Sequence, residues 1–214
     1  MGILTHLKRS LYTNKTISLI RGFFIKYYNY IQYFKWEFSN TNGPTPFLYK
    51  KQLIEYYAKR NNIKILVETG TFYGDMIDAT KNKFAEIYSI ELGLDLYNKA
   101  LWRFSKNLKI HLINGDSALE LKKLIPKLSE PAIFWLDAHY SGGVTAGNPE
   151  MPPIIEELTA IAKSNFDNII LINDARRFGV LNSYPNIEKI IKFVSKNIKG
   201  AKTSVSNDII RITK

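Results

Sequence analysis

Short apolar segments alternate with helix-patterned segments along most of the chain. Continuous apolar runs of a few residues are typical of strands that are buried on both faces of a sheet. Such runs predict strands at 63–68, 86–91, 110–114, 132–137 and 168–174. The tail, 203–213, predicts a closing strand with a turn at Asn207.

Segments with helical spacing of apolar residues fill the gaps between these strands. They predict helices at 47–60, 75–84, 94–104, 117–125, 153–162 and 186–197. Regular alternation of strand and helix is the pattern of a mostly parallel sheet with helices on both faces. The chain is therefore expected to have an α/β fold of Rossmann-like architecture.

The N-terminal part differs from the rest. Residues 1–40 are basic and aromatic, and 39–46 have the composition of a linker. One helical stripe within 17–36 is apolar and comprises Ile20, Phe23, Phe24, Tyr27, Tyr28, Ile31 and Phe34. This helix either packs on the main domain or a second subunit, as in a homodimer, or rests on an anionic membrane surface. We expect a helical extension with its linker at 1–42 and a main domain at 43–214.

Composition narrows the class of protein further. The chain has no cysteine, which excludes disulfides, thiolate catalysis and cysteine-based metal sites. A net charge of +11 is compatible with nucleic acid or an anionic membrane, but no RNA-binding signature is present, and a solvated lysine surface is the simpler interpretation. No stretch is apolar enough for a membrane span or a secretory signal. A cytoplasmic protein is expected, peripheral at the inner face of the membrane if its first helix binds lipid.

Residues 68–74, the glycine loop, carry the most information about function. Glycine has no Cβ, so Gly70 and Gly74 let the backbone approach a ligand closely. A dinucleotide site would have Gly-x-Gly-x-x-Gly, and acids at Glu68 and Asp75 would oppose its phosphates. An acid here suits the ammonium group of S-adenosylmethionine (SAM) instead. The residues of this loop that we expect to bind SAM are Glu68, Thr69, Gly70, Thr71 and Gly74.

Each later predicted strand also ends at or beside an acid, where ligands bind in open α/β sheets. Glu91 follows the glycine loop by about 20 residues, a spacing at which an acid accepts both ribose hydroxyls. Asp116 and Ser117 follow the third strand. They either contact the adenine of the cofactor or only cap the next helix.

Asp137, His139 and Asp174 are the candidates for catalysis. Strands four and five should be neighbours, so their terminal aspartates would face the same cleft. His139 lies two residues after Asp137, points the same way in an extended chain, and is expected to act as general base; the alternative is a histidine bonded to loop backbone. Asp137 is also a candidate cofactor contact. Asp137 and Asp174 together would suit a divalent cation such as Mg²⁺.

The acceptor site is less defined. Residues 140–150 are glycine-rich and polar, so they form either a substrate-covering loop or a plain connector. His139, Tyr140, Arg176 and Arg177 are the candidate acceptor contacts. The two arginines suit a phosphate or carboxylate, or they pair instead with Asp137 or Glu156.

Six motifs carry a family resemblance: 43–46, 67–76, 89–92, 114–117, 134–143 and 171–176. With them the chain from Gly43 onward resembles the class I SAM-dependent methyltransferases. More narrowly, it is similar to a bacterial O-methyltransferase-like group linked to polysaccharide or natural-product tailoring. The resemblance implies a seven-stranded sheet with an antiparallel last strand, and it permits a metal. The cofactor site that it implies comprises Glu68, Gly70, Gly74, Glu91 and Asp116.

The expected activity is SAM-dependent O-methylation of a sugar, glycan or small-molecule hydroxyl. A nucleic-acid methyltransferase is the alternative suggested by charge, although the Asn-Pro-Pro-Tyr type motif is missing after the fourth predicted strand. A further alternative is a non-catalytic protein of the same fold that docks to a membrane or partner through its basic N-terminal helix.

Overall fold

The structure, a computed structural model, describes residues 15–39, 43–137, 153–180 and 184–214. The chain divides into two compact units, 1–50 and 51–214. The second, here called the sheet unit, contains every strand of the described chain. The two units are described separately.

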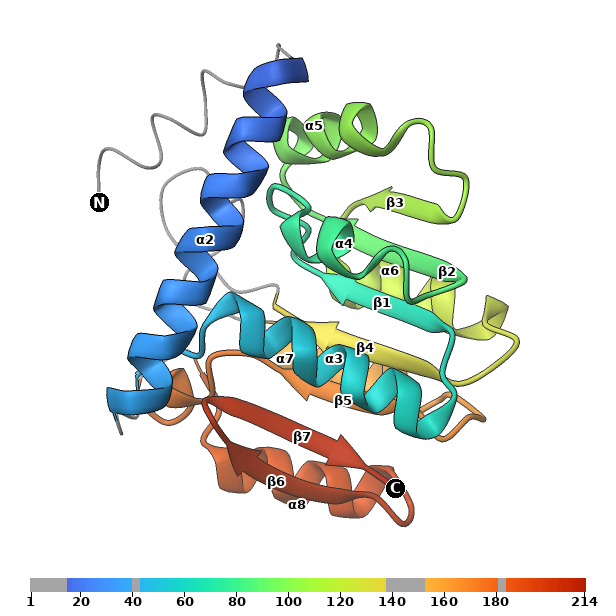
Figure 1. Cartoon of the computed structure of the whole chain (residues 1–214). Helices are drawn as coiled ribbons and strands as arrows, with labels where there is room; N and C mark the ends of the chain where they lie inside the picture. Colours follow the sequence, from blue (N-terminus) through green and yellow to red (C-terminus); the bar gives the residue numbers. More distant parts are fainter. Residues whose placement is uncertain (1–14, 40–42, 138–152, 181–183) are drawn as a thin grey trace. The chain divides into compact units, whose positions relative to one another are not determined.

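The sheet unit is built on one seven-stranded sheet of order β3-β2-β1-β4-β5-β7-β6 (Figure 1). Its strands are β1 (Ile65–Thr69), β2 (Glu86–Glu91), β3 (Ile110–Asn114), β4 (Ala132–Leu136), β5 (Ile169–Ile172), β6 (Lys202–Ser206) and β7 (Ile209–Thr213). The first five strands are parallel, and β7 is antiparallel to both β5 and β6. The predicted mostly parallel, Rossmann-like sheet is confirmed.

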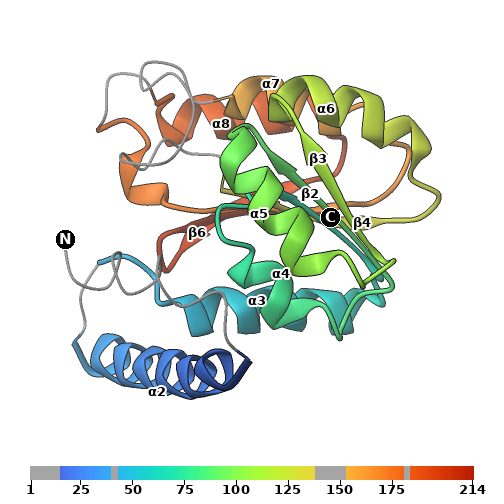
Figure 2. The same ribbon diagram turned by 90° about the horizontal axis from the view of Figure 1, so that it is seen from above.

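Helices cover both faces of this sheet. They are α3 (Phe47–Asn61), α4 (Asp75–Thr80), α5 (Leu94–Phe104), α6 (Ser117–Leu124), α7 (Ile154–Ile161) and α8 (Ile187–Asn197). Figure 2 shows α3 and α4 on one face and α6, α7 and α8 on the other, while α5 packs against β2 and β3. Because both faces are covered, every residue of β1, β4 and β5 is buried, which explains their continuous apolar sequences.

Several predicted elements differ from the structure in their bounds. The helix expected at 75–84 ends at Thr80, and Phe84 is buried outside it. The fourth and fifth strands end at Leu136 and Ile172, before the aspartates that follow them. The tail forms a hairpin of two strands, because Asn207 and Asp208 both adopt left-handed backbone conformations that reverse the chain.

The carboxyl ends of the parallel strands lie in register along one edge of the sheet. Thr69 of β1 pairs with Ile90 of β2 on one side and with Leu136 of β4 on the other. Successive strands run outward from β1 to β3, whereas β4 and β5 lie on the opposite side of β1. The order therefore reverses between β1 and β4, and a ligand site is expected beyond their carboxyl ends.

The first unit contains α2 (Lys15–Ser39) and the segment that leads into α3. Aromatic side chains are exposed along the described part of α2, among them Phe24, Tyr27, Phe34 and Phe38. A pocket of about 410 Å³ lies within this unit, between α2 and the residues that precede α3. No helix of the described ranges is both long and apolar enough to cross a membrane.

Candidate active site at the carboxyl edge of the sheet

The glycine loop has a tightly turned backbone at the end of β1. Gly70 and Gly74 adopt left-handed conformations with φ of 85° and 74°, and Phe72 between them has φ of 50°. A Cβ on Gly74 would lie 2.5 Å from Cε2 of Phe104, so only glycine fits there without displacing the ring. The loop thus brings bare backbone to the edge where the strand order reverses.

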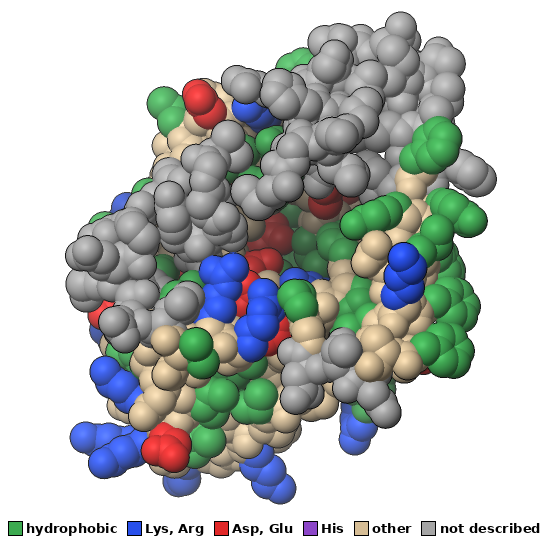
Figure 3. Space-filling model, turned by 90° about the vertical axis from the view of Figure 1, so that its left-hand side faces the viewer, with side chains coloured by type: hydrophobic (Ala, Val, Ile, Leu, Met, Phe, Trp, Pro, Cys, Tyr) green, Lys and Arg blue, Asp and Glu red, His purple; other side chains and the backbone are tan. Residues whose placement is uncertain are grey.

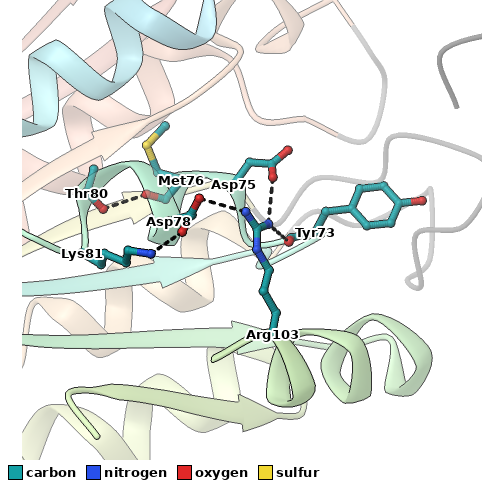
Figure 4. Close-up of polar contacts among 7 residues, drawn as sticks. All are labelled: Tyr73, Asp75, Met76, Asp78, Thr80, Lys81 and Arg103. Atoms are coloured by element: carbon teal, nitrogen blue, oxygen red, sulfur yellow. Dashed lines mark hydrogen bonds and ion pairs between the residues drawn. The ribbon is translucent and has the colours of Figure 1, made fainter. Parts of the chain in front are cut away.

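Arg103 of α5 contacts this loop and the start of α4 (Figure 4). Its guanidinium donates to the carbonyl oxygen of Tyr73 and pairs with Asp75 at 2.8 Å and Asp78 at 3.1 Å. The negative charge of Asp75 is therefore matched within the protein. Asp75 consequently does not oppose a phosphate as its sequence position suggests, and it is the glycine spacing that disfavours a dinucleotide site.

Glu68 is buried at the end of β1 and forms a chain of hydrogen bonds. Thr71 and Ser89 hydroxyls lie 2.6 Å apart, and Ser89 Oγ donates to Glu68 Oε2, also at 2.6 Å. Burial raises the pKa of Glu68 to about 8, and the hydrogen bond from Ser89 only partly opposes that rise. Three nearby carboxylates add to it: Asp137, Glu91 and Asp75. Glu68 is therefore protonated in the ligand-free protein at neutral pH.

Glu91 is buried at the end of β2 and held by two backbone groups. Its Oε2 accepts the N–H of Phe72 at 2.8 Å, and its Oε1 accepts the N–H of Gly93 at 2.8 Å. Each carboxylate oxygen retains a second acceptor position. The acid predicted to bind ribose is thus pre-oriented beside the glycine loop.

Asp116 caps α6 in the structure. Its Oδ1 accepts the N–H of Leu119 at 3.0 Å, which is a standard N-cap bond, and Ser117 is buried in the first turn. Of the two predicted roles of this pair, the cap is observed. A contact with adenine would have to use the remaining carboxylate oxygen or the backbone.

Asp137 and Asn173 follow the adjacent strands β4 and β5. Asn173 Nδ2 donates to Asp137 Oδ1 at 2.8 Å. The backbone N–H of Asp137 donates to the carbonyl oxygen of Thr69 in β1, at 3.0 Å. Asp137 therefore sits between β1 and β5, at the predicted cleft. Asn173 was not among the predicted site residues, although it directly precedes Asp174 at a strand end.

Asp174 faces arginines. It adopts a left-handed backbone conformation with φ of 59° and begins the short 3-10 helix η2 (Ala175–Arg177). One carboxylate oxygen lies 3.0 Å from Arg176 Nη1 and the other lies 3.0 Å from Arg177 Nε. Arg176 also pairs with Asp208 of the β6–β7 hairpin. Asp174 and Asp208 thus pair with these arginines, and the charge of Asp137, one of the two acids that the sequence suggests as partners, also acts on Arg177.

Arg177 is tied further into this cluster through Tyr184. Burial lowers the pKa of Arg177, but the hydrogen bond with Tyr184 and the charge of Asp174 outweigh burial and leave that pKa raised. The rings of Tyr184 and Phe178 pack edge to face, with centroids 5.3 Å apart. The guanidinium is thus fixed at this end of the sheet as a permanent cation.

Two buried polar atoms at the edge stand out. Among the described residues, Thr69 Oγ1 and Asn173 Oδ1 have no hydrogen-bond partner, although both side chains are almost fully buried. Unpaired buried polar atoms are costly in a folded protein and mark places where a ligand or water supplies the missing bond. Both residues bond to Asp137 through other atoms, Thr69 through its carbonyl oxygen and Asn173 through Nδ2.

The structure brings most of the predicted residues to one edge. Figure 3 looks onto this edge, where acidic side chains gather beside lysine and arginine side chains. The predicted residues that lie there are Glu68, Thr69, Gly70, Thr71, Gly74, Glu91, Asp116, Ser117, Asp137, Asp174, Arg176 and Arg177. His139, Tyr140 and the loop 140–150 lie outside the described residues. Sequence reasoning missed Ser89, Arg103 and Asn173, whose roles depend on partners distant in sequence.

Solved structures of known proteins share this architecture. An O-methyltransferase from Bacillus cereus, in complex with S-adenosylhomocysteine (SAH), is 13% identical over 77% of this chain and 80% of its own, with a TM-score of 0.56. TomG from Streptomyces achromogenes, in complex with SAM and involved in tomaymycin synthesis, is 14% identical over 76% and 78%, with a TM-score of 0.55. SAH-bound PaMTH1 from Podospora anserina is 14% identical over 94% and 96%, with a TM-score of 0.55.

The chain has the class I methyltransferase fold. The seven-stranded sheet with an antiparallel β7, implied by the sequence resemblance, is confirmed. No family model matches the chain, and no curated protein matches its sequence. At the low identities of its structural neighbours, the methyltransferase fold is shared, and the chemistry has to be argued from the residues of this chain.

Proposed function

We propose that the chain is a SAM-dependent methyltransferase that methylates a hydroxyl of a sugar, glycan or small molecule. The single observation that carries the proposal is the fixed carboxylate of Glu91. Its two oxygens are aligned by the N–H groups of Phe72 and Gly93, beside a loop in which position 74 accepts only glycine without displacing the Phe104 ring. A rigid, charge-bearing pair of acceptors suits the two hydroxyls of a ribose.

The proposed cofactor site extends from β1 to α6. The methionine end would lie at the glycine loop, where Thr69 Oγ1 is unpaired among the described residues and Glu68 is buried. An ammonium group beside Glu68 would lower its pKa and favour the carboxylate, so binding releases a proton. Asp116, Ser117 and Asp137 are the proposed contacts to the rest of the cofactor.

The proposed reaction transfers a methyl group from the sulfonium of SAM to an acceptor oxygen. A C–O bond forms, the C–S bond breaks, and the hydroxyl proton passes to a base of the protein. His139 is the proposed base, supported by Asp137, whose orientation is set by Asn173. His139 and Tyr140 also remain proposed acceptor contacts, together with Arg176 and Arg177.

The sequence also suggests a divalent cation at this site. Asp137 and Asp174 are the candidate ligands, but both oxygens of Asp174 already lie 3.0 Å from a guanidinium nitrogen. Within the described ranges, no group of three or more His, Cys, Asp and Glu side chains is placed to hold a metal ion. The described residues do not fit a metal site.

Two observations support alternative partners of the protein. The net charge of +11 favours nucleic acid as an alternative acceptor. Exposed aromatic side chains on α2 favour peripheral contact with a membrane or a homodimer through that helix, in a cytoplasmic protein. A non-catalytic protein docking through α2 is the alternative from another class.

TomG, a structural neighbour, takes part in tomaymycin synthesis, which supports a small-molecule acceptor by analogy.

Titration calorimetry with SAM and SAH tests the proposal, followed by transfer of labelled methyl to nucleotide sugars, glycans and RNA. We expect micromolar binding that Glu91→Ala abolishes. Absence of SAM and SAH binding by the wild-type protein would exclude the methyltransferase. Salt-sensitive RNA binding with methyl transfer to RNA would favour the nucleic-acid alternative. Full transfer activity in His139→Ala would exclude His139 as the base.

A further inference from the structure

Arg103 joins three structural elements at the cofactor loop. It belongs to the last turn of α5, yet it donates to the carbonyl oxygen of Tyr73 in the glycine loop. The same guanidinium lies 2.8 Å from Asp75 Oδ1 and 3.1 Å from Asp78 Oδ2, at the start of α4. Figure 4 shows these contacts converging on one side chain.

A second contact, through Glu91, links the glycine loop to the start of the same helix. Glu91 accepts the N–H of Phe72 with one oxygen and the N–H of Gly93, the N-cap of α5, with the other. The glycine loop is thus attached to both ends of α5. Phe72 is held through its N–H and Tyr73 through its carbonyl oxygen, so the 71–72 and 73–74 peptide groups, on either side of the 72–73 peptide, are both fixed in direction.

The contacts require the shape of arginine. Tyr73, Asp75 and Asp78 are reached by two nitrogens of one planar group, whereas a lysine ammonium is a single point on a flexible stem. The guanidinium carbon also lies 5.2 Å from the centroid of the Phe104 ring, the ring that closes on Gly74. Arg103 therefore contacts both the glycine loop and the Phe104 ring that packs against the loop.

The electrostatics of this cluster favour a charged clamp. Burial raises the pKa of Asp78, but the hydrogen bond with Lys81 and the charge of Arg103 outweigh burial and lower it. Lys81 lies 2.6 Å from Asp78 on its outer side. Asp78 consequently stays ionised and keeps Arg103 directed at the loop.

We propose that Arg103 is a positioning residue of the cofactor site, which holds the glycine loop in the conformation that binds SAM. This inference rests on the proposed function. Arg103 acts through Tyr73 and Asp75, and it would set the affinity for the cofactor without contacting the acceptor.

The test compares Arg103→Gln and Arg103→Lys with Lys99→Gln, an exposed position of the same helix that removes the same charge. Calorimetry with SAH measures affinity, and amide hydrogen exchange of residues 68–80 in the ligand-free protein measures loop order. We expect Arg103→Gln to weaken SAH binding about 10- to 100-fold, the range for losing a hydrogen bond to a charged group. Arg103→Lys should not restore it, and both should lose protection in the loop. Lys99→Gln should match the wild type.

Several outcomes would overturn the inference. SAH affinity and loop protection of Arg103→Gln equal to those of Lys99→Gln would do so, and so would full rescue by lysine. Should Arg103→Gln fail to fold, Arg103→Lys decides by the same two measurements. Absence of SAH binding by the wild-type protein would remove the proposed function, and hydrogen exchange alone would then decide whether Arg103 orders the loop.

Discussion

The hydroxyl of Ser89 donates a hydrogen bond of 2.6 Å to Oε2 of Glu68, and both side chains are buried at the candidate site. A buried carboxylate with one neutral donor is not fully compensated, because each carboxylate oxygen accepts more than one hydrogen bond. Burial is therefore the largest cause of the raised pKa of Glu68, about 8. The neutral acid is the form that the folded, ligand-free chain prefers.

Stability should depend on pH through this group. The folded pKa of Glu68 is about 8 and its ordinary value is 4.5. Between these values the folded protein retains a proton that the unfolded chain has lost, so raising the pH favours unfolding. The Glu68 contribution to the free energy of unfolding should be full below pH 4.5, fall as pH rises to 8, and change no further above it. Urea unfolding from pH 5 to 9 measures this decline.

Glu68→Gln is the matched control for that decline, since its amide does not titrate. The difference in stability between wild type and Glu68→Gln should shift against the wild type as the pH rises. A constant difference from pH 5 to 9 would mean that Glu68 is ionised throughout.

Thr69→Val should stabilise the ligand-free protein and weaken SAH binding. Thr69 Oγ1 is buried without a hydrogen-bond partner among the described residues, so replacing the hydroxyl by a methyl group removes an uncompensated desolvation cost of about 1–3 kcal/mol. A ligand that bonds this hydroxyl would lose that bond. Thermal unfolding and calorimetry check the two effects. Thr80→Val is the comparison, because Thr80 Oγ1 is bonded to the Met76 carbonyl and its loss should not stabilise.

Gly74→Ala should lower the free energy of unfolding more than Gly200→Ala does. The two glycines have similar left-handed conformations, with φ of 74° and 78°. A Cβ on Gly74 meets the Phe104 ring at 2.5 Å, whereas a Cβ on Gly200 meets nothing within 4 Å. Gly200→Ala therefore measures backbone strain, and the extra loss at Gly74, about 1–3 kcal/mol, measures the clash. Equal losses in chemical denaturation would show that Phe104 simply moves aside, and SAH binding should then be unchanged.

Asn173→Ala should slow methyl transfer about 10- to 100-fold, because Asp137 loses the donor that orients it. Asn168→Ala is a matched control. Its Oδ1 accepts the N–H of Ala132 at the opposite end of β4, so that variant should lose stability without a specific loss of turnover. Steady-state rates at saturating SAM distinguish the two. A similar fall in turnover for both variants would mean that Asn173 serves stability alone.

The parts of the site that sequence could locate are those encoded in short segments. Glu68 and the two glycines stand directly after a strand and before a helix, and Glu91 ends the next strand. Strand ends of a parallel sheet meet at one edge, so local pattern and a general rule suffice to bring these residues together. The turn at Asn207 is confirmed, but the helix end at Thr80 differs from the prediction, because a helix ends where packing turns the chain.

The parts that sequence could not locate are pairings between distant segments. Arg103 and Asp75 are 28 residues apart, and Arg176 meets Asp208 across 32 residues. A charged side chain in a sequence has many possible partners, and its choice depends on how the helices lie on the sheet. For that reason the two acids predicted as catalytic have different partners in the structure. Asp137 is held by an amide, and Asp174 is held by two arginines.

The sequence by itself determined the alternation of strand and helix, the glycine loop and the order of acids along the strand ends, because each depends on neighbouring residues and on periodicity. Only the tertiary structure decided that β7 inserts between β5 and β6, that Glu68 is buried with a pKa near 8, and that Arg103 clamps the glycine loop. These features depend on burial and on contacts between segments far apart in the chain, which no local pattern contains.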